Sequence, residues 1–115
     1  MKGNPVTVEQ EGGVGPGALE GAVVLDVRRA PVFAQADAMI PGASWRDPAE
    51  VAQWAHELVP GQRVVVYCVH GHEVSQNTAR SLRAAGIDAD FLQHGFEGWK
   101  AAGRPLATKA ASAPG

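Results

Sequence analysis

The residues best suited to covalent chemistry lie in one short stretch, Tyr67-Cys68-Val69-His70-Gly71-His72-Glu73-Val74-Ser75. It holds the single cysteine of the chain and follows an apolar, mostly β-branched run at 64–67. A strand that delivers a cysteine to a glycine-containing loop, with a helix just behind, is a recurrent way to make a reactive thiolate. The N–H groups of such a loop and of the first helical turn stabilise negative charge on sulfur, which lowers the thiol pKa from its usual value of about 8.5.

A purely structural interpretation of Cys68 is open, because a cysteine at the end of an apolar strand is often only a small buried hydrophobic residue. The loop favours the reactive thiol. Gly71 lies three residues after Cys68, where a tight cradle needs a residue that tolerates positive φ or close backbone approach. A structural cysteine needs no such loop.

A second set of polar residues follows the apolar run at 22–25. Asp26 and Arg28 stand at the carboxyl end of this predicted strand, and in open α/β sheets sites form at that edge. Asp26 is either a carboxylate that orders the local backbone or a group at the edge of the site. Arg28 either faces an anionic ligand or belongs to a structural ion pair.

Length and composition indicate one soluble domain. The chain has 115 residues, a net charge of −2 and one cysteine, which suffices for one core and excludes an internal disulfide. Acidic and basic residues are mixed, without the basic cluster that nucleic-acid binding requires. We find no apolar signal segment and no run long enough to span a membrane. A lone thiol suits a reducing compartment, so we expect a cytoplasmic protein.

The elements that must position these residues alternate between strand and helix. Strands are predicted at 22–25, 44–45, 63–67 and 89–92, and helices at 31–36, 48–58, 75–85 and 95–103. Asp47 is the expected N-cap of the helix at 48–58, and Trp54 belongs to its buried stripe. Short connections predict a mostly parallel sheet with helices on both faces. Residues 1–20 read as a flexible leader with a possible edge strand at 6–8, and 108–115 as a disordered tail.

Four sequence features, in this order, resemble the rhodanese family of single-domain sulfurtransferases. They are Leu25-Asp26-Val27-Arg28, Ile40-Pro41-Gly42-Ala43, the loop Cys68-Val69-His70-Gly71-His72-Glu73, and Gly95-Phe96-Glu97-Gly98-Trp99. The resemblance covers roughly residues 20–106, so residues 21–107 are taken as the rhodanese-like domain. It implies an α/β, three-layer fold with a five-stranded, mostly parallel sheet and helices on both faces.

The resemblance also implies a mechanism. Cys68 would take the sulfane sulfur of a small anionic donor such as thiosulfate, or of a thiol persulfide, and pass it to cyanide, a thiol or a protein acceptor. No metal and no organic cofactor is implied. Asp26 and Arg28 would support the site. The loop that binds the substrate and the persulfide would comprise Val69, His70, Gly71, His72, Glu73 and Val74.

The loop departs from the family pattern in ways that bear on the donor. Many members carry Arg or Lys just after the cysteine, where this chain has Val69. Glu73 would repel both a thiolate and thiosulfate by on the order of 1 kcal/mol at about 5 Å. His70 and His72 could offset that charge or be exposed loop residues. A persulfide donor is therefore as compatible with the loop as thiosulfate.

Two other functions compete with sulfur transfer. Related phosphatases and arsenate reductases place Arg six residues after the cysteine, where this chain has Val74, so the bidentate clamp on an oxyanion is missing. A non-enzymatic module that senses oxidants or binds a partner is the main alternative, because a reactive cysteine is also prone to oxidation.

Overall fold

The computed structural model describes residues 13–109. Its elements are η1 (Pro16–Leu19), β1 (Val23–Asp26), α2 (Ala30–Gln35), β2 (Ala38–Met39), β3 (Ser44–Trp45), η2 (Pro48–Glu50), α3 (Val51–Trp54), η3 (Ala55–Glu57), β4 (Arg63–Tyr67), α4 (Glu73–Ala84), β5 (Asp88–Phe91), α5 (Gly95–Ala101) and β6 (Ala107–Thr108). The predicted edge strand at 6–8 and most of the predicted tail lie outside the described residues.

The main sheet is parallel throughout, with strand order β3-β1-β4-β5. The register pairs Val23 with Val64 and Asp26 with Tyr67, so β1 and β4 end side by side. The α/β class and the parallel sheet predicted from the sequence are confirmed. All four strands present their carboxyl ends at one edge, and this edge carries Cys68.

The strand count differs from the prediction: within residues 13–109 the main sheet has four strands rather than five. At the free edge of β5 a single residue, Val14, forms a parallel bridge to Leu92. Its N–H donates to the oxygen of Phe91 at 2.8 Å, and its oxygen accepts from the N–H of Gln93 at 2.9 Å. Gly13 adopts a positive φ of 79° and Pro16 has no N–H, so the ladder does not extend along residues 13–16.

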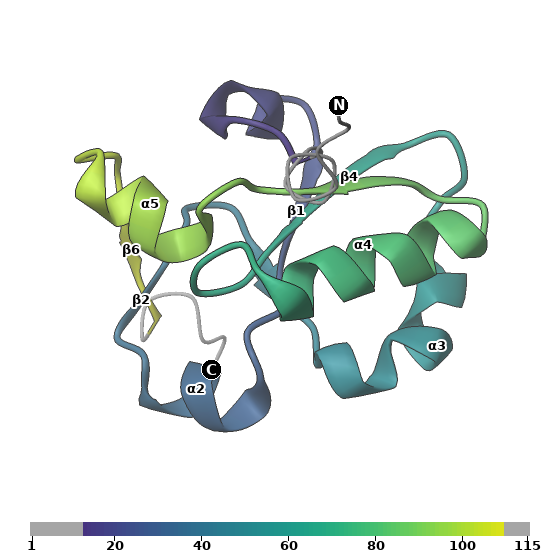
Figure 1. Ribbon diagram of the computed structural model, residues 1–115, viewed down its shortest axis with the longest axis horizontal. Coiled ribbons are helices and arrows are strands. Elements are labelled where there is room, and N and C mark those ends of the chain that lie inside the picture. The colour runs from purple at the N-terminus through teal and green to yellow at the C-terminus, as the bar shows by residue number, and fades with distance from the viewer. Residues whose placement is uncertain (1–12, 110–115) are drawn as a thin grey trace, which may run out of the picture.

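Side chains of β4 point alternately into two hydrophobic cores. Val64 and Val66 join the core beneath α3 and α4, whereas Val65 and Tyr67 join the core beneath α5. Figure 1 shows the sheet between these two helical layers. Burial on both faces explains why 64–67 reads as a continuous apolar run rather than an alternating one. The predicted core residue Trp54 is 5% exposed.

The chain ends of the described part also pack against the domain. Leu19, within the predicted leader, is 9% exposed and belongs to the core beneath α5. Thr108, within the predicted tail, pairs with Ala38 in the antiparallel β2–β6 ribbon. The described residues of both segments are therefore part of the folded unit, because they pack against or pair with residues far away in sequence.

The segment predicted as one helix over 48–58 is composite. Asp47 caps it as expected, since its side chain accepts from the N–H of Ala49 at 3.0 Å. Only Val51–Trp54 is α-helical, and 3-10 turns flank it. The N–H of Leu58 donates to the oxygen of Ala55 at 3.2 Å, and this shorter spacing tightens the last turn.

Candidate active site

Cys68 lies directly after β4, at the carboxyl edge of the sheet. The strand that leads to it is fully buried from Val64 to Tyr67, and Cys68 itself is 6% exposed. The helix behind the loop starts at Glu73, slightly earlier than the sequence pattern indicates. The predicted arrangement of strand, loop, cysteine and helix N-terminus is present.

The start of α5 holds the cysteine loop from behind. The N–H of Phe96 donates to the oxygen of Cys68 at 2.8 Å, and the N–H of Glu97 donates to the oxygen of Val69 at 2.9 Å. These bonds use N–H groups that the first turn of a helix cannot satisfy internally. The loop is therefore fixed by a segment almost thirty residues further along the chain.

Two glycines make this close contact possible. Gly95 has a φ of 57°, and a Cβ there would lie 2.4 Å from the oxygen of Cys68 and 2.6 Å from the nitrogen of Gly71. Gly71 has a φ of 75°, and a Cβ there would lie 2.7 Å from the nitrogen of His94. Gly71 thus meets both conditions that the sequence analysis set for it, positive φ and close backbone approach.

The other side of the loop offers hydrogen-bond donors. Within residues 13–109, the backbone N–H groups of residues 69–75 donate to no backbone carbonyl. Residues 73–75 form the first turn of α4, whose aligned peptide dipoles place partial positive charge at this end. The segment can therefore accommodate negative charge.

Ser75 is a site residue to which the sequence analysis gave no role. Its hydroxyl oxygen accepts a hydrogen bond from the Sγ–H of Cys68 at 3.1 Å, and Ser75 is 0% exposed. A hydroxyl can reverse its role, so the same group can donate to a thiolate. The signal was its position in the first turn of α4, next to the loop that carries Cys68.

Asp26 and Arg28 form a buried ion pair, so the structural alternative holds for Arg28. Their closest atoms, Nη2 of Arg28 and Oδ2 of Asp26, are 2.6 Å apart, and the two side chains are 3% and 0% exposed. Asp26 also accepts from the N–H of Arg28 at 3.0 Å, which orders the backbone at the end of β1. The Arg28 guanidinium additionally donates to the oxygen of Ala38 at 2.9 Å.

Tyr67 extends this buried network towards the β2 segment. Its O–H donates to Oδ2 of Asp26 at 3.1 Å, and its oxygen accepts from the N–H of Ile40 at 3.1 Å. Burial, followed by the charge of Asp26, raises the pKa of the Tyr67 phenol far above its ordinary value. Tyr67 therefore acts as a neutral donor that joins β4, β1 and the Ile40 turn.

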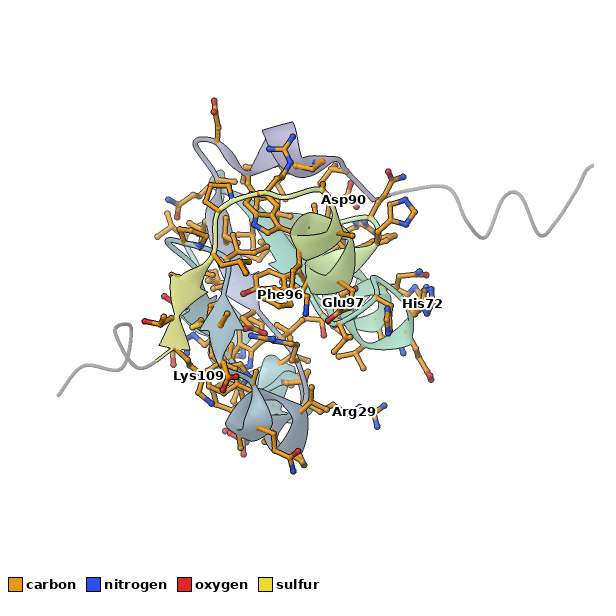
Figure 2. The ribbon with its side chains drawn as sticks, turned by 90° about the vertical axis from the view of Figure 1, so that its left-hand side faces the viewer. Arg29, His72, Asp90, Phe96, Glu97 and Lys109 are labelled. Atoms are coloured by element: carbon orange, nitrogen blue, oxygen red, sulfur yellow. The ribbon has the colours of Figure 1, made fainter. Side chains whose placement is uncertain are left out.

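A cavity of about 220 Å³ opens onto Cys68. It is lined by Arg28, Arg29, Val32, Cys68, Val69, His70, His72, Glu73 and Val74. The structure thus brings five of the six predicted loop residues to the cysteine's own cavity, whereas Gly71 lies behind. Arg29 was not predicted, and its exposed side chain extends on the same side of the molecule as His72 (Figure 2).

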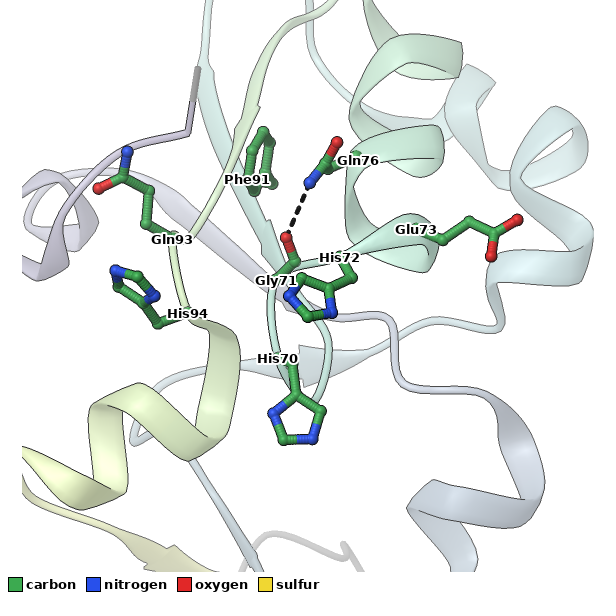
Figure 3. A pocket seen from close by; sticks show the side chains of 8 residues that line it. All are labelled: His70, Gly71, His72, Glu73, Gln76, Phe91, Gln93 and His94. Atoms are coloured by element: carbon green, nitrogen blue, oxygen red, sulfur yellow. Dashed lines mark hydrogen bonds between the residues drawn. The ribbon is translucent and has the colours of Figure 1, made fainter. Parts of the chain in front are cut away.

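His70 and His72 stand between this cavity and a second one on the other side of the loop. Their rings are 5.8 Å apart, measured between centroids. The second cavity, of about 350 Å³, also contains His94, Gln76 and other polar side chains (Figure 3). Within residues 13–109, no group of three or more His, Cys, Asp or Glu side chains is arranged to hold a metal ion.

The rhodanese-like domain family matches residues 16–102 of this sequence. The chain belongs to the rhodanese-like domain family. This confirms the resemblance inferred from the four sequence features, and it accounts for the arrangement of β4, the cysteine loop and α4. No curated protein matches the chain significantly in sequence.

Solved structures support this rhodanese-like assignment. A protein from Lactobacillus plantarum is 32% identical with a TM-score of 0.72, over 88% of this chain and 92% of that one. A rhodanese-related protein from Thermoplasma volcanium is 19% identical with a TM-score of 0.72, over 84% and 98% of the two chains. A thiosulfate sulfurtransferase from Pseudomonas aeruginosa is 25% identical with a TM-score of 0.69, over 84% of this chain but 19% of that one.

The described part of this rhodanese-like chain, residues 13–109, includes no helix that is both long enough and apolar enough to cross a membrane.

Proposed function

We propose that this rhodanese-like protein is a sulfurtransferase that carries sulfur as a persulfide on Cys68. The observation that carries the proposal is the position of the thiol. Cys68 faces a cavity at the carboxyl edge of the sheet, in front of loop N–H groups that have no backbone acceptor within residues 13–109. The similarity to a thiosulfate sulfurtransferase from Pseudomonas aeruginosa supports the same reaction class.

In the first step, the Cys68 thiolate attacks the outer sulfur of thiosulfate. A new S–S bond forms to Cys68, the S–S bond of thiosulfate breaks, and sulfite leaves with the electron pair. The product is an enzyme persulfide whose terminal sulfur carries the negative charge. Loop N–H groups, which have no backbone acceptor within residues 13–109, and the Ser75 hydroxyl, which lies 3.1 Å from the sulfur, would donate to that charge, and preorganised donors stabilise anions without reorganisation.

In the second step, an acceptor takes the terminal sulfur. Cyanide, a small thiol or a protein thiol attacks the outer sulfur, the persulfide bond breaks, and the electron pair returns to Cys68 as a thiolate. Each step exchanges one S–S or S–C bond for another, so neither needs a metal or an organic cofactor. The mechanism likewise requires no nucleic acid and no membrane.

Intact-protein mass spectrometry tests the proposal. The protein is mixed with thiosulfate, or with a small-thiol persulfide, and cyanide is added second. We expect one added sulfur atom that cyanide removes as thiocyanate. Cys68→Ala is the control, because it removes the only thiol and should abolish the mass increase.

The alternative, a module that senses oxidants or binds a partner, predicts a different result. Neither donor would then add sulfur to Cys68 at a useful rate, and that outcome would refute the sulfurtransferase. Sulfur gained from a persulfide but not from thiosulfate would keep the sulfurtransferase and exclude thiosulfate as its donor.

A further inference from the structure

We infer that the physiological sulfur donor is a zwitterionic small persulfide of the amino-acid type, with one ammonium and one carboxylate. The inference rests on the proposed function and narrows its substrate class. It comes from two charged side chains, Arg29 and Glu73, that line the cavity of Cys68 from different elements.

Arg29 and Glu73 are available to a ligand. Both side chains are exposed, and within residues 13–109 neither forms an ion pair. Arg29 stands just before α2, and Glu73 begins α4. Glu73 lines both the cavity of Cys68 and the second cavity, and Figure 3 shows its carboxylate directed away from His94 and Gln93.

The other charge in this cavity is already neutralised. Arg28 is 3% exposed and its partner Asp26 is 0% exposed, with 2.6 Å between their closest atoms. The mouth of the cavity therefore presents one accessible cation and one accessible carboxylate. A ligand that carries one charge of each sign complements this pair better than a dianion does, because the dianion meets repulsion from Glu73.

The walls and the size of the cavity also favour a small zwitterionic persulfide. Val32, Val69 and Val74 supply apolar lining beside the sulfur, and an apolar wall suits the methylene group of a thiol better than a fully hydrated dianion. The volume of about 220 Å³ corresponds to roughly seven water molecules at about 30 Å³ each. A ligand of the size of a single amino acid fits within this volume.

The reaction with such a donor balances without a further reagent. The Cys68 thiolate attacks the outer sulfur of R–S–SH, a new S–S bond forms, and the donor's S–S bond breaks. The thiolate R–S⁻ leaves with the electron pair and takes up the proton of the transferred sulfur, so the products are R–SH and the Cys68 persulfide anion. Arg29 would bind the donor's carboxylate and Glu73 its ammonium, and this would orient the outer sulfur towards Cys68.

The test compares four donors in single-turnover loading of Cys68 followed by mass spectrometry. They are cysteine persulfide, with both charges; N-acetylcysteine persulfide, with the carboxylate only; cysteamine persulfide, with the ammonium only; and thiosulfate. All four donors are compared at one pH, at which the amines of cysteine and cysteamine are protonated. We expect cysteine persulfide to load at least tenfold faster than either singly charged persulfide.

Two variants test which side chain binds the ammonium of the donor and which binds its carboxylate. Glu73→Gln should slow the two ammonium-bearing donors about tenfold and accelerate thiosulfate and N-acetylcysteine persulfide, which are anions without an ammonium. Arg29→Gln should slow the two carboxylate-bearing donors and thiosulfate about tenfold, and should not slow cysteamine persulfide, which has no carboxylate. Arg63→Gln and Asp88→Asn are matched controls, because this ion pair of 2.7 Å lies at the opposite end of β4, and both should behave as wild type.

The outcomes separate this inference from the proposed function. Equal loading by all persulfides, or variants that affect every donor alike, would overturn the zwitterionic donor while the sulfurtransferase stands. Failure of all four donors to load Cys68 would refute the sulfurtransferase itself. Circular dichroism of each variant shows whether a loss of rate comes from unfolding.

Discussion

Arg28 and Arg29, which are neighbours after β1, have different roles because their side chains point in different directions. Arg28 turns into the protein and pairs with Asp26, whereas Arg29 is exposed and lines the cavity of Cys68. Removing one partner of a buried pair leaves an uncompensated charge and typically costs about 3–5 kcal/mol. Arg28 and Asp26 are thus structural supports of the site, and Arg29 is its accessible cation.

Ser75 carries the first prediction at this scale. Ser75→Ala removes the hydroxyl that lies 3.1 Å from Sγ of Cys68. A hydrogen bond to a charged group is worth about 1.5–3 kcal/mol, so we expect single-turnover persulfide formation to slow by about tenfold or more. Stopped-flow loading measures this rate. A Ser75→Ala protein that loads at the wild-type rate would contradict a role for the hydroxyl.

Tyr67 carries the second prediction, which concerns pH. Burial and the charge of Asp26 raise the pKa of Tyr67 in the folded state, whereas the phenol of an unfolded chain has a pKa of about 10. Above about pH 10 the unfolded state therefore loses a proton that the folded state keeps, so stability contributed by Tyr67 is present below that pH and falls as pH rises. Tyr67 is the only tyrosine, so tyrosinate absorbance should appear only as the protein unfolds.

Tyr67→Phe supplies the control for this dependence. It leaves the N–H of Ile40 and one oxygen of Asp26 without their phenol partner, and we expect a loss of about 1–3 kcal/mol in the free energy of unfolding at neutral pH. The decline of stability above about pH 10 should be shallower in the variant. Equal alkaline slopes for wild type and variant, from urea unfolding, would argue against the shifted phenol.

At the scale of elements, the site is built where two helices begin. The start of α4 directly follows the cysteine loop in the sequence, and N–H groups at the start of α5 donate to the oxygens of Cys68 and Val69. The loop is therefore confined between two helix N-termini, with the central strand β4 leading into it. This explains how a short loop that contains Gly71 and two histidines is held in one conformation.

Gly95 tests this confinement. In Gly95→Ala the new methyl group would lie 2.4 Å from the oxygen of Cys68, so the loop or α5 must shift. We expect a loss of more than about 2 kcal/mol in stability and severe loss of persulfide formation. Denaturant unfolding and single-turnover loading measure the two effects.

Gly103→Ala is the matched control for Gly95→Ala. Gly103 also has a positive φ, of 75°, but a Cβ there meets nothing within 4 Å. Backbone strain should lower the free energy of unfolding of this variant by only about 1 kcal/mol, and Cys68 should load sulfur at the wild-type rate. Similar losses of loading in both glycine variants would show that backbone strain, not contact with the cysteine loop, is responsible.

At the scale of the whole molecule, stability is unevenly distributed. Strands β1 and β4 are paired on both sides within the main sheet, whereas β2 and β6 form a separate short ribbon. The inner strands lie between two hydrophobic cores. Elements with many buried contacts open only on global unfolding, and peripheral elements open more easily.

Native-state hydrogen exchange tests this distribution. Amides of Val64–Tyr67 should exchange with the free energy of global unfolding, and amides of the β2–β6 ribbon with a value several kcal/mol lower. Cys68 would then directly follow the most stable strand of the molecule, β4. Uniform protection across both sheets would contradict this expectation.

The sequence by itself determined the parts that local chemistry controls. The buried strand 63–67, the glycine-containing loop and the helix behind it follow from residue types and their spacing, and they place Cys68 at the edge of a parallel sheet. Ordered motifs, each weak alone, were enough to indicate the family. Local patterns also predicted the cap at Asp47 and the burial of Trp54.

Only the tertiary structure decided the remainder, because it depends on contacts between segments far apart in the chain. The clamp from α5 joins residues 68–69 to 96–97, and within residues 13–109 a single bridge from Val14 stands at the place of a fifth strand. Both adjacent arginines line the cavity, and which of them keeps an exposed charge there is decided by the ion pair of Asp26 with Arg28 inside the fold. No local pattern records such a choice, since both residues have the same side chain.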